Sequence, residues 1–181
     1  MIFSKWLLVI LLASFLIPPS KYILWEKNRK LTYTDFKGIY KSDETHAGNT
    51  ECEFTYTCQY EKKKLKIASK VLFDTENSWL KFNDAALLSH EQVHFDIAEI
   101  HIRLFRQRCR NFRFTKADFR TQIDSIFNLT DTDCDALQQK YDAETKNGRV
   151  TSKQKIWFNK IAAKVLESNH LADTAQIVLC N

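Results

Sequence analysis

The pattern His-Glu-x-x-His at residues 90–94 limits the folds open to this chain, because it lies in a run from residue 78 to residue 128 that contains neither Gly nor Pro. In a helix of about 3.6 residues per turn, His90 and His94 lie one turn apart on the same face, so both imidazoles can bind one Zn²⁺. Glu91 then lies beside the metal, where its carboxylate can take a proton from a zinc-bound water and pass it to a leaving amine. The pattern predicts a zinc site, although two histidines in the core of a buried helix would give the same spacing.

Two other polar residues of the same run are poor candidates for a third ligand. Glu99 lies nine residues after His90, about 180° round the helix, and therefore points away from the metal. His101 shares the face of His94, but it lies about 10 Å further along the helix axis, too far for bonds of about 2 Å to one zinc ion. The third ligand is therefore expected from another part of the chain.

A two-residue period begins at residue 51 and predicts a half-buried strand over residues 51–60, where Cys, Phe and Tyr alternate with polar residues. Lys62 to Lys64 are expected to turn the chain into a second strand over residues 65–73, the hairpin partner of the first. If this second strand lies at the edge of the sheet, its backbone can pair with an extended peptide in a cleft.

Helical patterns fill most of the remaining chain. Helices are expected over four segments: about 84–108, 116–127, 133–146 and 152–167. Thr130 and Asp131 are expected to cap the third of these helices, and Asn147 with Gly148 to end it. The sequence thus predicts an α+β fold, with a small antiparallel sheet packed on a helical body built around the His-Glu-x-x-His helix.

Residues 1–20 differ from the rest of the chain. Lys5 precedes an apolar run over residues 6–17, which Pro18, Pro19 and Ser20 close. This run is too short to span a bilayer as a helix and has the length of a signal-peptide core, so export to the periplasm or cell envelope is expected. The alternative is an uncleaved N-terminal anchor, with membrane anchoring through residues 6–25. Residues 31–181 are expected to form a single domain.

The composition favours a globular body, with 44% hydrophobic and 27% charged residues. The formal net charge is +5, but the lysines are scattered among acids. A solvated basic surface explains this distribution, and no nucleic-acid partner is expected.

Five cysteines in an exported chain leave at least one thiol unpaired within the chain. Cys52 and Cys58 lie about 20 Å apart if they share one straight strand, so they cannot form a bridge with each other. A disulfide is expected between Cys109 and Cys134. Cysteine ligands for zinc are not expected, because the sequence contains no Cys-x-x-Cys.

Several segments together resemble one bacterial family. They are Leu-Thr-Tyr-Thr-Asp-Phe-Lys-Gly at 31–38, Phe73 followed by Ser78-Trp79, the Phe-Asp-Ile-Ala centre of residues 90–99, and Tyr-Asp-Ala-Glu-Thr at 141–145. The chain resembles the predicted secreted zinc-dependent proteases of bacteria, catalogued as domain of unknown function 922. The resemblance covers about residues 31–161 and implies a zincin-like metalloprotease domain.

The resemblance also implies roles for particular residues. It implies His90 and His94 as zinc ligands and Glu91 as the catalytic base. Relatives usually have Thr-x-His-Gly where this chain has Asn147 in place of the histidine. The third ligand is then either this position or Asp142, with Tyr141 hydrogen-bonding the oxyanion. Asp142 is preferred, because a carboxylate oxygen binds zinc better than a neutral amide oxygen does.

Two functions follow as expectations. The first is an exported, zinc-dependent endopeptidase that hydrolyses a peptide or protein substrate with a zinc-activated water. The second is a non-catalytic cell-envelope binding protein that retains the zincin-like fold. A shared fold does not choose between them, because function depends on the site.

Overall fold

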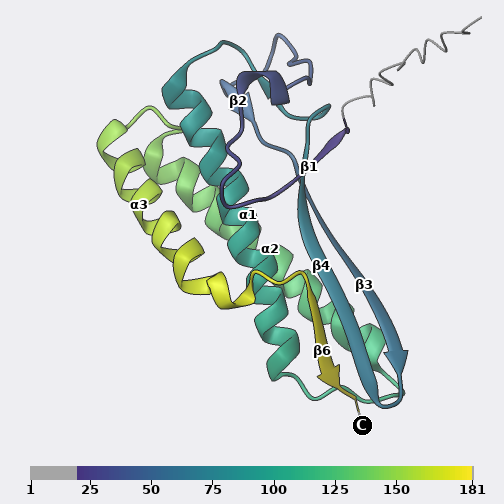
Figure 1. Cartoon of the computed structure of the whole chain (residues 1–181). Coiled ribbons are helices and arrows are strands. Elements are labelled where there is room, and N and C mark those ends of the chain that lie inside the picture. Colours follow the sequence, from purple (N-terminus) through teal and green to yellow (C-terminus); the bar gives the residue numbers. More distant parts are fainter. Residues whose placement is uncertain (1–19, 181) are drawn as a thin grey trace, which may run out of the picture.

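The computed structural model describes residues 20–180 and has the predicted α+β architecture (Figure 1). The apolar run at residues 6–17 lies outside the described residues. The strand β1 (Tyr22–Leu24) belongs to the main sheet, and Ile23 is buried in its core. The folded part therefore begins before residue 31, within the segment 6–25 considered as an anchor. Among residues 20–180, no helix combines the length and the apolar character needed to cross a bilayer.

The main sheet is antiparallel and is built on the predicted hairpin of β3 (Cys52–Glu61) and β4 (Lys64–Asp74). Lys62 and Lys63 have φ values of 50° and 62°, as the two-residue turns that match the twist of a hairpin require. A second, small sheet pairs β2 (Gly48–Asn49) with β5 (Trp79–Leu80).

Residues 65–73 do not form an edge strand, so the pairing with an extended peptide considered for that case does not apply. β4 lies in the middle of the sheet: β3 pairs along one side of it, while β1 and β6 (Ala175–Leu179) pair with opposite ends of the other side. The sequence analysis did not predict β6. Its side chains alternate between buried and exposed, and the strand pairs with β4 from the far end of the chain.

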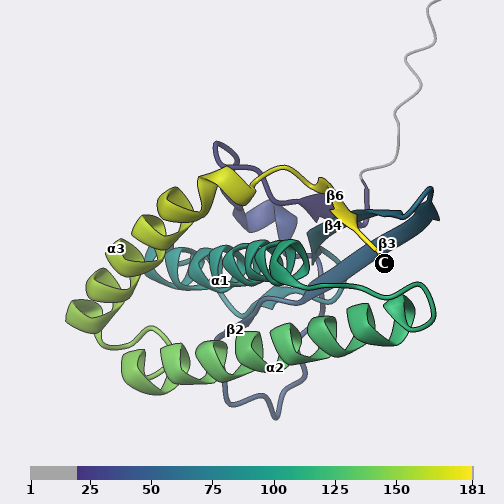
Figure 2. The same cartoon turned by 90° about the horizontal axis from the view of Figure 1, so that it is seen from below.

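The His-Glu-x-x-His motif lies on the predicted long helix, α1 (Ala85–Asn111). Its N-cap is Asp84, whose carboxylate accepts a hydrogen bond from the backbone N–H of Leu87 at 2.8 Å. The helix α1 lies between two others, α2 (Phe119–Thr145) and α3 (Thr151–Glu167), and the sheet covers another side of it (Figure 2). Two short 3₁₀ turns, Tyr33–Asp35 and Ser168–Leu171, complete the elements of residues 20–180.

The two helices predicted between residues 116 and 146 are one continuous helix, α2. Thr130 and Asp131, predicted as a cap, lie inside it. The Thr130 hydroxyl donates to the backbone carbonyl four residues earlier at 2.7 Å and accepts from Arg108 of α1 at 2.9 Å. Because this polar side chain has partners within the helix and on α1, it does not interrupt the backbone.

The end of α2 agrees with the sequence prediction. Lys146, Asn147 and Gly148 have φ values of 52°, 52° and 79°, so three successive residues in the left-handed region end the helix after Thr145. This tight turn starts α3 close to the end of α2, and it packs Gly148 against the ring of His90.

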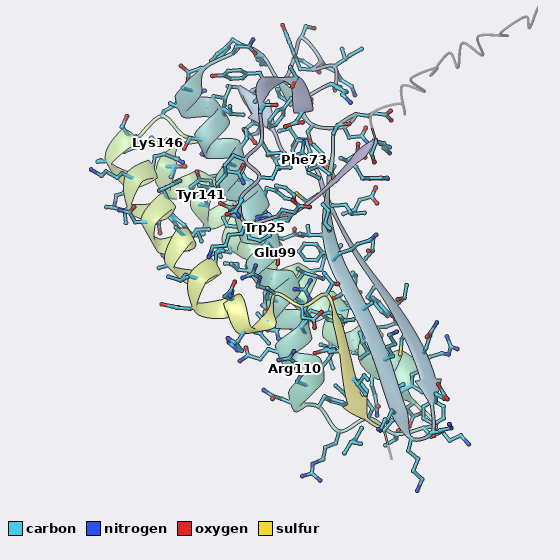
Figure 3. The ribbon with its side chains drawn as sticks, viewed as in Figure 1. Trp25, Phe73, Glu99, Arg110, Tyr141 and Lys146 are labelled. Atoms are coloured by element: carbon cyan, nitrogen blue, oxygen red, sulfur yellow. The ribbon has the colours of Figure 1, made fainter. Side chains whose placement is uncertain are left out.

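The core has two parts. The larger lies between the sheet and α1, where Phe73 of β4 packs on Phe95 and Trp25 donates to Asp96 of α1 at 2.8 Å (Figure 3). The smaller lies among the three helices, around Tyr141 and Trp157. Burying one large apolar side chain contributes about 1.5–3 kcal/mol, so both parts hold α1 rigidly in place.

All five cysteines are free thiols, and the predicted bridge between Cys109 and Cys134 is not formed in this structure. Cys109 lies in the larger core with Cys180, whereas Cys134 lies in the smaller core. Burial raises the pKa of both predicted partners, Cys109 and Cys134, to about 12. Neither thiol is therefore a reactive thiolate at neutral pH.

Candidate metal centre

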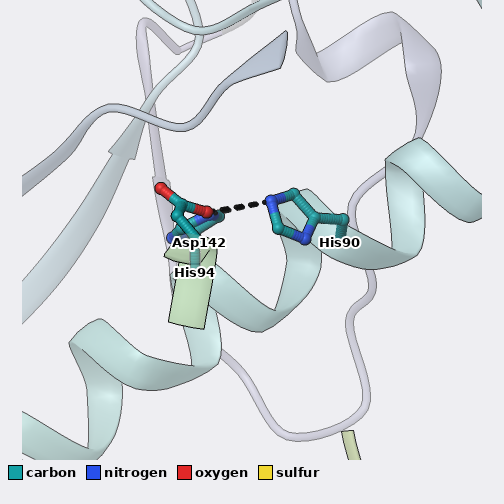
Figure 4. A group of neighbouring side chains, drawn as sticks. All are labelled: His90, His94 and Asp142. Carbon is teal, nitrogen blue, oxygen red and sulfur yellow. Dashed lines mark hydrogen bonds and ion pairs between the residues drawn. The ribbon is translucent and has the colours of Figure 1, made fainter. Parts of the chain in front are cut away.

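Three potential ligand atoms converge where α2 packs on α1 (Figure 4). The Nε2 atoms of His90 and His94 are 3.2 Å apart. Asp142 Oδ1 lies 3.1 Å from the first of them and 2.9 Å from the second. The two histidines predicted from the motif and the preferred third ligand, Asp142, therefore place their ligand atoms at one point.

The distances fit a metal ion. Three atoms at about 2.0–2.1 Å from one zinc ion in tetrahedral geometry lie about 3.3 Å from one another. The three separations in the centre, 2.9–3.2 Å, are close to that value. His90, His94 and Asp142 could thus bind a metal with little movement.

Two glutamines, the half-buried Gln138 and the buried Gln154, fix the orientation of the imidazoles. Gln138 of α2 places Oε1 2.5 Å from Nδ1 of His94, while its amide nitrogen donates to the backbone carbonyl of His94 at 3.1 Å. Gln154 of α3 places Oε1 3.1 Å from Nδ1 of His90. A carbonyl oxygen only accepts, so each Nδ1 carries a proton. Nε2 of each imidazole then carries a second proton only in the charged form, and in the neutral form it presents a lone pair to the centre.

The charges of the centre call for a positive ion. Burial alone would lower the pKa of His94, but the hydrogen bond with Asp142 and the negative charges of Glu91 and Asp142 raise it above its ordinary value. Burial opposes ionisation of Asp142, but hydrogen bonds with His90 and His94 hold the pKa of that carboxyl well below its usual range. Both shifts have one cause: lone pairs and a carboxylate face each other, and positive charge stabilises them.

Tyr141 lies beneath the two imidazoles and does not line the cavity in front of them. Its ring stacks on His90 at 4.6 Å between centroids and meets His94 edge-on at 4.9 Å. Its hydroxyl donates to the backbone carbonyl of His90 at 3.3 Å and accepts from Gln154. The predicted oxyanion role does not fit this position, and Tyr141 instead supports the rings from the core.

Glu91 is held on the other side by the chain that leads into β3. Thr50 donates to Glu91 Oε2 at 2.8 Å. A Cβ atom added at Gly48 would lie 2.5 Å from Glu91 Oε1, so only glycine leaves room for the carboxylate there. Glu91 is 3% exposed, and its negative charge acts on His94. The carboxylate is therefore fixed next to the candidate ligands.

A cavity of about 320 Å³ opens onto the centre and includes His90, Glu91, His94 and Asp142 in its wall. Residues 46–52 form another part of the wall, and α2 contributes several further side chains. Three more acids face it: Glu51, Asp131 and Asp135. A small molecule or an extended segment of polypeptide can therefore reach the candidate ligands from solvent.

The other candidates from the sequence lie elsewhere or contribute less. Glu99 points away, as predicted, and forms a buried ion pair with Arg103 at 2.7 Å. His101 donates from Nδ1 to the backbone carbonyl of Ile97, 2.8 Å away, and is not part of the centre. Asn147 lines the cavity, but Asp142 supplies the third ligand atom.

Sequence reasoning missed Gln138, Gln154, Thr50 and Gly48. Gln138 could have been found, because it lies four residues before Asp142 and so shares its helix face. The other three reach the centre only through tertiary packing, and no spacing in the sequence indicates them.

Comparison with known protein families matches residues 24–148 to the family described as "Bacterial protein of unknown function (DUF922)". The match covers about two thirds of the chain. The chain belongs to this family. All three candidate ligands and Glu91 lie within the DUF922 region, whereas Gln154 of α3 lies beyond it. Comparisons with curated proteins and with solved structures gave no match. The description of DUF922 names no activity, so the function has to be argued from the centre itself.

Proposed function

We propose that this chain is an exported zinc-dependent endopeptidase. One observation carries the proposal: three ligand atoms of His90, His94 and Asp142 lie within 3.2 Å of one another beside the fixed carboxylate of Glu91. Two imidazoles and a carboxylate suit zinc, and catalytic zinc sites use three protein ligands with one position left open. The proposal for export rests on the apolar run at residues 6–17.

His90, His94 and Asp142 would hold the zinc ion, which would supply a Lewis acid for a scissile carbonyl and for a water that loses its proton near neutral pH. Glu91 accepts that proton and then gives it to the leaving amine. Thr50 keeps the carboxylate in place during both transfers. Gln138 and Gln154 keep the imidazole Nδ1 atoms protonated, so that both Nε2 atoms remain available as ligands.

The substrate is proposed to lie along residues 46–51. This segment lines the cavity beside Glu91, whereas β4 is in the middle of the sheet and cannot receive a peptide. A polypeptide that enters the cavity places one of its carbonyl groups near the three ligands.

One observation favours the alternative of a non-catalytic binding protein in the cell envelope. The hydroxyl of Tyr141, expected to bind the oxyanion, is turned into the core. A protein of that kind would keep the metal and bind a polypeptide without cleaving it.

Zinc content and peptide hydrolysis distinguish these functions. We expect one zinc per chain in the purified protein, loss of zinc and of casein hydrolysis after treatment with a chelator, and recovery of both when zinc is added. Glu91→Gln should keep the zinc and lose hydrolysis by at least about 100-fold, whereas Asp142→Asn should lose the zinc.

Glu76→Gln, which changes an exposed acid outside the centre, serves as the matched control. Zinc binding without hydrolysis in the wild-type protein would support the binding function. Failure of the protein to bind zinc at all would refute the peptidase function and favour a binding protein that keeps the fold without the metal.

A further inference from the structure

The outer face of the main sheet, opposite α1, combines lysines with aliphatic side chains. On β4, Lys64, Lys66 and Lys70 point away from the core, because each alternates with a buried residue. On β6, Ile177 and Leu179 point the same way. The register places Ile177 opposite Lys66 and Leu179 opposite Lys64. The two kinds of side chain therefore form one continuous surface, which we term the outer sheet face.

The aliphatic side chains of this face are exposed to solvent. Ile177 is 66% exposed and Leu179 is 71% exposed, and Leu24 of β1 is 41% exposed near the other end of β4. No element within residues 20–180 covers them, since the helices lie on the opposite side of the sheet (Figure 1). Burying apolar surface contributes about 25 cal/mol of favourable free energy per Å². A contact that covers these aliphatic side chains is therefore favourable.

The lysines of the face are free to interact with a partner. Among the described residues, Lys64, Lys66 and Lys70 form no ion pair. The two acids on the same face belong to β3 and have partners: Glu53 accepts from Tyr22 at 2.6 Å, and Glu61 lies 3.6 Å from Lys62. The surface over β4 and β6 is therefore positively charged.

We propose that the outer sheet face binds the surface of an anionic phospholipid bilayer. Lysines there meet lipid phosphates while their alkyl stems, with Ile177 and Leu179, contact the boundary between headgroups and acyl chains. A second copy of the chain fits the face poorly, because face-to-face contact would bring three lysines from each copy together, and the two acids of the face, Glu53 and Glu61, already have partners. This binding does not depend on the proposed peptidase activity.

Two features agree with this orientation. The apolar run of the sequence ends at residue 17, five residues before β1 of the same sheet, so a chain that enters the membrane there would begin to fold beside it. The cavity at the metal centre lies on the other side of the sheet, between α1 and α2. A molecule bound through the outer sheet face keeps that cavity open to solvent.

Amine labelling of the full chain tests the proposal without any variant. The protein is incubated with vesicles of phosphatidylcholine, or with vesicles of three parts phosphatidylcholine to one part phosphatidylglycerol, and then acetylated. Mass spectrometry gives the labelling rate of each lysine. Each lysine near an anionic surface strengthens partitioning about five-fold, so three together contribute on the order of 100-fold. We expect Lys64, Lys66 and Lys70 to react at least about five-fold more slowly with the anionic vesicles only.

Internal and matched controls come from α3. Lys153 and Lys155 are exposed there and should react equally with both kinds of vesicle. The double variant Ile177→Ser/Leu179→Ser should lose most of the protection. Ile156→Ser/Leu166→Ser removes two aliphatic side chains that are 59% and 64% exposed on α3 and should keep it.

Three results would overturn the proposal. The first is equal labelling of Lys64, Lys66 and Lys70 on both kinds of vesicle. The second is protection that depends on protein concentration without vesicles, which would mean that a second copy covers the face. The third is protection that persists in concentrated salt, where charges further apart than about 3 Å are screened.

Discussion

Replacing Gly48 by alanine should disable Glu91 while leaving the candidate metal ligands in place. The new Cβ would lie 2.5 Å from Glu91 Oε1, 3.0 Å from its Cδ and 2.9 Å from Leu80 Cδ2. Ordinary contact begins at about 3.4 Å, so the carboxylate has to move by about 1 Å. That movement breaks or lengthens the 2.8 Å hydrogen bond from Thr50.

The magnitudes separate an effect on catalysis from an effect on folding. Overpacking of this kind costs about 1–3 kcal/mol of unfolding free energy, which leaves a protein of ordinary stability folded. A catalytic group displaced by about 1 Å costs about 100-fold in rate. We therefore expect Gly48→Ala to bind zinc as the wild type does, to lose about 100-fold in kcat/KM on a quenched peptide, and to remain folded at 25 °C.

Gly38→Ala is the matched control. Its Cβ would lie 2.8 Å from the backbone carbonyl oxygens of Glu76 and Ser78, which cannot move as easily as a side chain. Urea unfolding should show a larger loss of stability for Gly38→Ala than for Gly48→Ala, while the zinc content and kcat of its folded fraction stay close to wild type. Unchanged hydrolysis in Gly48→Ala, or loss of its zinc, would show that the contact with Glu91 does not control catalysis.

Two further predictions concern stability and localisation. Burial alone would raise the pKa of Asp74, but hydrogen bonds from Lys21, Asn77 and the backbone of Asn77 and Glu76 lower it. The folded-state pKa is thus below that of the unfolded chain, so this contribution to stability is present above about pH 4 and is lost as the pH falls through the folded-state value. In urea unfolding, Asp74→Asn should cost about 1–3 kcal/mol at pH 7 and clearly less at pH 3; an equal cost at both would contradict the argument. A fusion of residues 1–30 to a reporter that is active only after export should be active, and a silent reporter would remove the support for export.

Local patterns predicted the elements whose causes are local. The alternation over residues 51–60 corresponds to one half-buried face of β3, and Asp84 caps α1 through a bond to a residue three positions later. The left-handed turn at Asn147 and Gly148 is likewise set by those residues themselves. In each of these cases, the partners lie within a few residues of one another.

Elements that depend on distant contacts could not be predicted in the same way. The sequence pattern predicts Thr130 as a helix cap. In the structure its hydroxyl accepts a hydrogen bond from Arg108 of α1, and α2 continues through it. The five residues of β6 are too few for a reliable period, and their pairing with β4 decides their conformation. The position of β4 in the middle of the sheet, which removes it as a peptide-binding edge, follows from that same pairing.

The residues of the candidate centre also differ in whether local or distant contacts place them. The separation of His90 and His94 follows from helix geometry alone, whereas Asp142 was selected through the resemblance and the ligand chemistry of a carboxylate. The positions of Thr50 and Gln154 follow only from how the second sheet and α3 pack on α1. The oxyanion role expected for Tyr141 came from its position in the motif. Its ring is buried beneath the imidazoles, so its hydroxyl donates to the backbone of His90 instead.

The pairing of β6 with β4 has a consequence for the order of folding. Lys64 pairs with Leu179, and the buried guanidinium of Arg106 donates to the carbonyl of Leu171 at 2.8 Å. Until the last residues are available, β4 lacks one neighbour and Arg106 lacks one acceptor inside the core, and contacts between such distant residues form slowly. We expect folding to be completed only after the whole chain has been synthesised. If the chain is exported as proposed, this delay would keep it unfolded during passage through a narrow channel, and the core would close on the far side.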